Sequence, residues 1–205
     1  MSGVVWTTTV SLQPSREPGE PALGLTLHRL MKFQDIPQFT RSASYQVNVS
    51  WRSLERQLEQ FNDRNGMLDL DPDFQRGHVW SPEKQIAYVE FILRGGNSSK
   101  TLQFNCSSWQ REYNTPLQLV DGKQRLEAVR KFLRNELPIF GGSFLADFTD
   151  ELPHCQVDFI FCVNNLKTRS EVLQWYLELN SGGVVHTEEE LNKVRKMLDD
   201  TMTYK

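Results

Sequence analysis

The sequence predicts an α+β fold, in which short strands and amphipathic helices share one hydrophobic core. Three apolar runs of strand length, at residues 101–106, 116–120 and 156–163, lie between polar or turn-forming segments. Five other stretches carry apolar residues at helical spacing, and most of them follow a residue that caps helices well. A length of 205 residues suits one domain with a full core and an appendage.

The start signals place the expected helices. Ser50, Ser81 and Ser170 each precede a stretch with an apolar face, and Pro82 strengthens the second start. Thr187 opens a capping box ahead of the last helix. The expected helices are 50–61, 81–94, 123–134, 170–179 and 187–198, and a further short strand is expected at 67–70.

The first 45 residues are expected to form an extension of a main domain that covers residues 46–205. Residues 4–12 include three consecutive threonines and favour a strand. Residues 13–21 hold three prolines and a glycine and favour a loop. The pattern between residues 23 and 45 supports no assignment.

Composition and motif content exclude several functions. A net charge of -3 gives no global basic field for nucleic acid, and no apolar run reaches the ~18 residues of a membrane span. The three cysteines form no CxxC pair, which favours reduced thiols and a cytoplasmic location. P-loop, GxGxxG, GxSxG and HExxH motifs are missing, so the corresponding nucleotide, hydrolase and zinc sites are not expected.

Asp69, Asp71 and Asp73 alternate in a way that suggests a metal site. A calcium loop beginning at Asp69 would need glycine at its sixth position and glutamate at its twelfth, where this sequence has Phe74 and Trp80. The calcium interpretation therefore fails. One carboxylate that shares a magnesium ion with a bound phosphate stays open as an alternative.

The stretch 116–134 is the strongest candidate for a binding site. A strand passes through the turn Asp121-Gly122 directly into a helix whose first turn carries Lys123 and Arg125. The helix dipole disfavours cations at this end, whereas the backbone N–H groups there favour an anion such as phosphate. The alternative is an ordinary strand, turn and helix with solvated surface charges.

Two further stretches are candidate parts of the same site. Gln75 and Arg76 precede the helix start at residue 81, and arginine suits bidentate phosphate contacts, although a lone arginine is often a surface ion-pair partner. The turn at residues 180–183 has the sequence NSGG. Its N–H groups are suited to an anion, although a plain helix end explains the same residues.

Together the three stretches DPDFQRGHVW (71–80), LVDGKQRLEAV (119–129) and LNSGGVVHTEEEL (179–191) form an ordered set. The set resembles the N-terminal nucleotide-binding domain of GmrSD-type modification-dependent restriction systems, over roughly residues 50–196. The resemblance implies a ParB/sulfiredoxin-like fold, a small mixed sheet surrounded by helices. The DGQQR motif of that family corresponds to residues 121–125, with Lys123 in place of the first glutamine.

The resemblance also implies a site that binds a nucleoside triphosphate with Mg²⁺, and in many relatives hydrolyses it. Arg76 and Arg125, with Lys123, would neutralise phosphate oxygens, and Asp121 would be the general base or a magnesium-linked carboxylate. The expected nucleotide contacts are Gln75, Arg76, Gly122, Lys123, Gln124, Arg125, Asn180, Gly182 and Gly183.

Three functions stay open at this point. The first is an NTPase of a phage or bacterial DNA modification, restriction or counter-defence system, in the cytoplasm of a bacterial or phage-infected cell. The second is a phosphotransferase that acts on a modified DNA base or a small hydroxyl compound. The third is a DNA- or partner-binding module without catalysis. DNA or a separate nuclease or modification protein is the expected partner, since relatives that cut DNA carry a further nuclease domain.

Overall fold

A computed structural model describes residues 36, 38–41, 45–63, 67–75, 80–109, 114–153, 156–181 and 188–203. The chain divides into two compact units, Met1–Pro37 and Gln38–Lys205, and every helix and strand named below belongs to the second. The strand expected at residues 4–12 and the loop expected at 13–21 lie outside the described residues.

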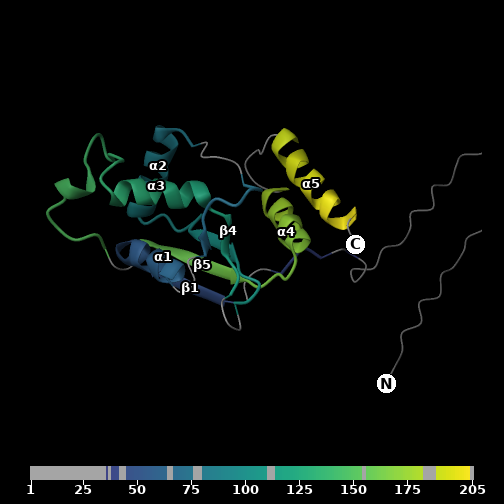
Figure 1. The fold of residues 1–205 in the computed structure, drawn as a ribbon. Coiled ribbons are helices and arrows are strands. Elements are labelled where there is room, and N and C mark those ends of the chain that lie inside the picture. The colour runs from purple at the N-terminus through teal and green to yellow at the C-terminus, as the bar shows by residue number, and fades with distance from the viewer. Residues whose placement is uncertain are drawn as a thin grey trace, which may run out of the picture. The chain divides into compact units, whose positions relative to one another are not determined.

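The second unit is built on a mixed five-stranded sheet, of which Figure 1 labels β1, β4 and β5. The strand order is β1-β5-β3-β4-β2. Its strands are β1 (Tyr45–Ser50), β2 (Leu68–Asp69), β3 (Thr101–Asn105), β4 (Leu117–Asp121) and β5 (Asp158–Asn164). The pairs β1/β5 and β3/β4 are antiparallel, whereas β3/β5 and β2/β4 are parallel. This sheet and its helices confirm the predicted α+β class.

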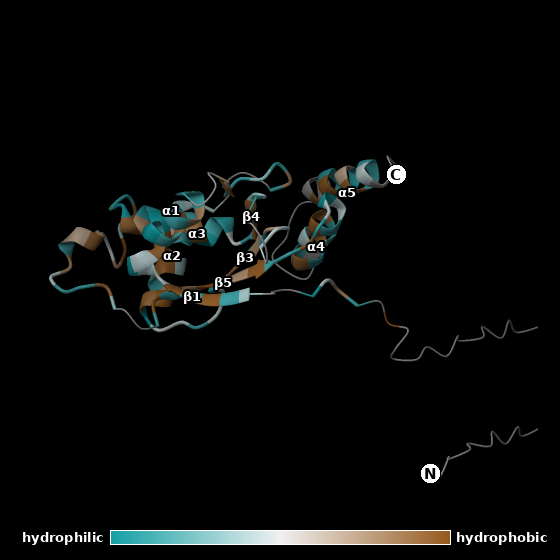
Figure 2. Ribbon diagram, turned by 60° about the horizontal axis from the view of Figure 1, so that its bottom comes forward, coloured by the Kyte–Doolittle hydropathy of each residue, from teal (hydrophilic) through white to brown (hydrophobic). Residues whose placement is uncertain are grey.

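Helices cover the sheet in two groups. The first group is α1 (Leu54–Asp63), α2 (Pro82–Leu93) and α3 (Lys123–Leu133), and the second is α4 (Arg169–Ser181) and α5 (Glu188–Thr203). Figure 2 shows the first group gathered over the strands and the second set apart from it.

Side-chain alternation along β4 explains why two cores form. Leu117 and Leu119 belong to the larger core, with apolar residues of α1, α2 and α3. Val120 points to the opposite face and belongs to a smaller core, with Trp175 of α4 and Val194 of α5. The end of β4 therefore lies between the two helix groups, and this is where the site is found.

The helix starts agree with the sequence in part. Ser81 caps α2 as predicted, because its Oγ accepts from the Lys84 N–H at 3.4 Å. The expected cap at Ser50 is wrong, since Ser50 makes no side-chain cap and a 3-10 turn, Trp51–Ser53, precedes α1. The expected cap box at Thr187 lies outside the described residues.

The expected cap of α4 at Ser170 is also wrong, since the helix begins at Arg169, before the expected cap. Thr168 Oγ1 accepts from the Glu171 N–H at 3.2 Å, and Glu171 Oε2 accepts from the Thr168 N–H at 2.8 Å. These reciprocal bonds form a capping box. The box fixes the start of α4 at Arg169.

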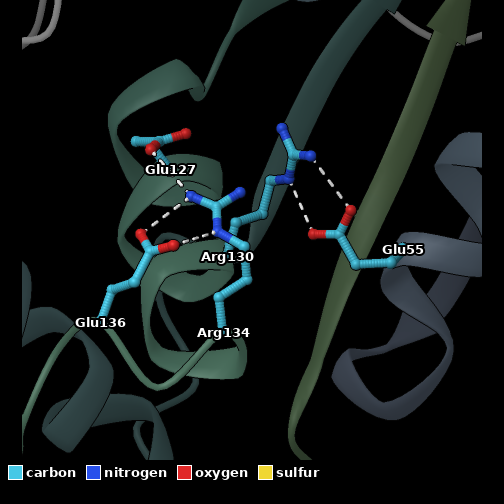
Figure 3. Close-up of polar contacts among 5 residues, drawn as sticks. All are labelled: Glu55, Glu127, Arg130, Arg134 and Glu136. Carbon is cyan, nitrogen blue, oxygen red and sulfur yellow. Dashed lines mark hydrogen bonds and ion pairs between the residues drawn. The ribbon is translucent and has the colours of Figure 1, made fainter.

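Ion pairs hold the far end of α3 (Figure 3). Arg130 makes a two-bond contact with Glu55 of α1, at 2.7 Å from Nε and 3.0 Å from Nη2. Arg134 contacts Glu127 at 3.4 Å and Glu136 at 3.0 Å. These cations lie at the carboxyl end of α3, where the helix dipole favours them. These contacts therefore lie at the end of α3 opposite to the turn in which β4 enters the helix.

Candidate functional site

A cavity of about 420 Å³ lies where β4 turns into α3. Its walls come from β4, from the first turns of α2 and α3, and from the last turn of α4. Seven residues that the sequence nominated line it: Gln75, Asp121, Gly122, Lys123, Gln124, Arg125 and Asn180. Arg76, Gly182 and Gly183, which were also nominated, lie outside the described residues.

Gly122 is the N-cap of α3, and only glycine fits this position. Its φ of +105° lies in the left-handed region that side chains rarely adopt. A Cβ atom added here would overlap the Leu102 side chain and lie 3.1 Å from Arg125 Nη2. The close approach of β3 and the turn into α3 therefore both depend on the missing side chain.

Asp121 and Arg125 form an ion pair across that turn. Arg125 Nη2 donates to Asp121 Oδ2 at 2.5 Å, with a spacing of four residues. Arg125 is mostly buried, and its Nε is buried with no hydrogen-bond partner among the described residues. A buried guanidinium N–H without an acceptor is costly, and because this Nε is itself buried it is not exposed to a ligand in the cavity.

Lys123 pairs with Asp71, which lies 52 residues earlier in the chain. The other two aspartates of that stretch have separate contacts. Asp69 accepts from the Asp71 N–H at 3.1 Å, and Asp73 pairs with Arg169 at 2.8 Å. Across the described residues, no three histidine, cysteine or acidic side chains are grouped to hold a metal ion. Each of the three aspartates therefore has its own partner, and the three do not form one metal site.

The three amide side chains of the cavity also brace its walls. Gln124 Oε1 accepts from the Trp80 N–H at 3.0 Å, and Asn180 Nδ2 donates to the Tyr176 carbonyl at 2.7 Å. Gln75 Nε2 donates to the carbonyl of Leu119 in β4. Gln75 and Gln124 each join two segments at the cavity, whereas the Asn180 bond lies within α4. Each amide thus has a structural role besides any contact with a ligand.

Sequence reasoning missed the wall that α2 contributes, formed by Trp80, Lys84 and Tyr88. Lys84 Nζ lies 4.9 Å from the centroid of the Trp80 ring, and the Trp80 and Tyr88 rings meet edge to face at 5.5 Å. Tyr88 donates to the Ser99 carbonyl at 2.9 Å. The spacing of four between Lys84 and Tyr88 was a usable signal, because such residues share a helix face.

Burial raises the pKa of the Tyr88 hydroxyl above its ordinary value of 10.0, and the nearby charge of Arg125 opposes the shift. The hydroxyl is therefore neutral at physiological pH. It acts as a hydrogen-bond donor to Ser99 and as an apolar wall, and it is not suited to proton transfer.

The residues that line the cavity fit a magnesium ion only if the ion is also bound by a ligand's phosphate groups. Asp121 is the one carboxylate among the described residues that line the cavity, and Arg125 contacts its Oδ2 atom. Mg²⁺ is often held by one or two carboxylates together with substrate phosphates and water. Asp121 would supply such a single ligand, and the remaining ligands would come from phosphate and water.

Three findings concern the chain as a whole. Among the described residues no helix is both long and apolar enough to cross a membrane. The mixed sheet agrees with the α+β class, whereas the ParB/sulfiredoxin-like assignment stays a prediction. Comparison with protein-family models, with curated proteins and with solved structures finds no match to this chain.

Proposed function

We propose that the protein binds a nucleoside triphosphate in the cavity at the β4–α3 junction and hydrolyses it with Mg²⁺. One observation carries the proposal. The same cavity is lined by residues from three separate stretches of the sequence, namely Gln75, residues 121–125 and Asn180. Its volume of about 420 Å³ lies within the range of small-molecule sites, roughly 300–1,000 Å³.

The end of the cavity at α3 suits the phosphates. Gly122 lets the chain turn there without a side chain, so a ligand can approach the first turn of the helix closely. The helix dipole and the N–H groups of that turn favour an anion. Lys123 and Arg125, which are paired with Asp71 and Asp121, place two cationic side chains on the same wall.

The wall at α2 suits a nucleoside. Trp80 and Tyr88 provide aromatic surface, and the ammonium group of Lys84 lies over the Trp80 ring. Aromatic rings bind bases by stacking, with little dependence on which base is present. The cavity therefore combines a cationic part and an aromatic part, as a nucleotide requires.

The chemistry of hydrolysis depends on position and charge. Magnesium, when bound with the nucleotide, would neutralise charge on the phosphate oxygens. Arg125 would stabilise the charge that develops on the transferred phosphoryl group. The carboxylate of Asp121, next to Arg125, would act either as the magnesium ligand or as the general base that orients the attacking water and accepts its proton. A role in DNA modification, restriction or counter-defence, with DNA or a separate nuclease as partner, rests on the sequence motifs alone.

A γ-labelled nucleotide assay with Mg²⁺, with and without DNA, tests the proposal. We expect release of labelled phosphate by the natural protein, and a fall of roughly 10²-fold or more in Arg125→Gln and Asp121→Asn. Arg134→Gln is the matched control, because Arg134 caps the opposite end of the same helix and should leave the rate unchanged.

The other outcomes separate the competing functions. Transfer of label to DNA would identify a phosphotransferase in place of a hydrolase. Unchanged turnover in Arg125→Gln would contradict the assignment of the site. Absence of nucleotide binding by the natural protein would leave only the non-catalytic binding module.

A further inference from the structure

The lysine on the cavity wall already holds an anion that belongs to the chain. Lys123 forms an ion pair with the carboxylate of Asp71, across 52 positions of sequence. The Lys123 side chain is 19% exposed, whereas that of Asp71 is 75% exposed. Asp71, which is not among the described residues that line the cavity, thus reaches the cation from the solvent side, whereas Lys123 itself lines the cavity.

The second cation of the wall is held differently. Arg125 is paired with Asp121 within one turn of chain, so both partners are fixed by the same strand and helix. Separating them would require the β4–α3 turn itself to change. The Asp71–Lys123 pair has no such restraint, and its exposed carboxylate can rotate into water.

The stretch that carries Asp71 is anchored without that pair. Phe74 is 3% exposed and packs in the smaller core against Tyr176, with ring centroids 5.4 Å apart. Gln75 donates from its side chain to the Leu119 carbonyl and from its backbone to the Pro72 carbonyl at 2.9 Å. Release of the Asp71 carboxylate would therefore leave the segment in place.

We propose that Asp71 is a displaceable internal anion, which an incoming phosphate group replaces on Lys123. The proposal rests on the proposed nucleotide site. An exposed ion pair contributes little, because water screens it and the side chains lose freedom. A phosphate that carries two charges and several acceptor oxygens competes well with a single exposed carboxylate. Arg125 would stay oriented by Asp121 throughout the exchange.

This arrangement makes Asp71 a determinant of affinity. An anion that takes the place of the carboxylate on Lys123 then lies near its negative charge. Asp71 would therefore lower the affinity of phosphate ligands at this wall, and its effect should weaken as salt concentration rises.

A double-mutant cycle tests the exchange. Binding of ATP with Mg²⁺ and of inorganic triphosphate is measured by calorimetry for the natural protein, Asp71→Asn, Lys123→Gln and the double variant. We expect Asp71→Asn to tighten binding of both probes by roughly 2- to 10-fold at low ionic strength. In the Lys123→Gln background the same substitution should change nothing, because the exchange no longer takes place.

Asp73→Asn is the matched control. Asp73 lies two residues away, is 62% exposed and pairs with Arg169, which does not line this cavity. We expect its affinities to equal those of the natural protein. Asp71→Ala repeats the test with a second side chain, and thermal unfolding verifies that each variant is folded.

Two outcomes overturn the proposal in distinguishable ways. The exchange would be refuted, and the nucleotide site left intact, if the natural protein and Asp71→Asn bound the probes with equal affinity. The same conclusion would follow if Asp71→Asn still tightened binding in the Lys123→Gln background. Failure of both probes to bind either the natural protein or Asp71→Asn would refute the nucleotide site and the exchange together.

Discussion

At the scale of single residues, the site depends on groups whose surroundings leave little choice of side chain. Gly122 adopts a left-handed φ of +105° and lies against Leu102 of β3. Arg125 is mostly buried and is oriented by Asp121. Both features follow from the DG turn and the four-residue spacing in the sequence. The partner of Lys123 does not, because Asp71 is distant in sequence and only the folded chain brings the two together.

Replacement of Gly122 by alanine should destabilise the protein more than the same change at Gly95. Both glycines have positive φ, but an added Cβ at Gly95 meets nothing within 4 Å, whereas at Gly122 it overlaps Leu102. We expect a loss of about 1 kcal/mol for Gly95→Ala, from backbone strain alone, and of about 3 kcal/mol for Gly122→Ala. Urea unfolding measures both, and equal losses would contradict the close approach of β3.

Tyr88 should make the protein sensitive to alkaline pH. Burial raises its pKa in the folded state above the ordinary 10.0, so the unfolded state loses this proton at lower pH than the folded state does. The contribution of the Tyr88 hydroxyl to the free energy of unfolding is complete below pH 10. It is lost as the pH rises through the pKa of the folded state. We expect stability to fall less steeply between about pH 9 and about pH 11 in Tyr88→Phe. Parallel curves for the two proteins would contradict the burial of the hydroxyl.

At the scale of elements, buried strands and long amphipathic helices were predictable from sequence. Strands β3, β4 and β5 were found because each is short and places buried apolar residues inside the sheet, with polar residues between them in β3 and β4. The edge strand β1 was missed because its apolar signal is weak. Gln46 and Asn48 are exposed, and Val47 and Val49 are the only aliphatic residues of the strand. The start of α4 was misplaced although Thr168 and Glu171 have the spacing of a capping box.

The contact between α1 and α3 should give a small, measurable stabilisation. Arg130 and Glu55 form two hydrogen bonds of 2.7 and 3.0 Å, but both side chains are partly exposed. We expect Glu55→Gln to cost up to about 1 kcal/mol in the free energy of unfolding. Glu127→Gln, which removes a single contact of 3.4 Å, is the control and should cost less. The reverse order in urea unfolding would contradict the paired geometry.

At the scale of the whole molecule, the sequence located most of one wall of the cavity and missed another. Residues 121–125 were found because a turn and a helix start are local signals. The spacing of Lys84 and Tyr88 places both on one face of α2, but whether that face lines the cavity depends on how α2 packs beside α3. The braces from Gln75 and Gln124 likewise connect segments that meet only in the folded chain.

A chain shortened to residues 38–205 should keep the fold and the cavity. The sheet, both cores and all described cavity-lining residues belong to the unit Gln38–Lys205. Thr40 N–H donates to Glu178 at 2.7 Å and the Arg41 carbonyl accepts from Asn164 at 2.8 Å, so the new terminus would be held. We expect an unchanged thermal midpoint and unchanged nucleotide affinity, and a large fall in either would contradict the division into units.

Amide chemical shifts of the ¹⁵N-labelled protein, followed during titration with ATP and Mg²⁺, show most directly where a nucleotide binds. The largest changes should occur at the N–H groups of residues 122–126, where the chain enters α3, and at the indole N–H of Trp80. A second cavity, of about 250 Å³, is lined by Lys167, Thr168 and Val172 and provides an internal comparison. Changes confined to that cavity, with residues 122–126 unmoved, would contradict the proposed site.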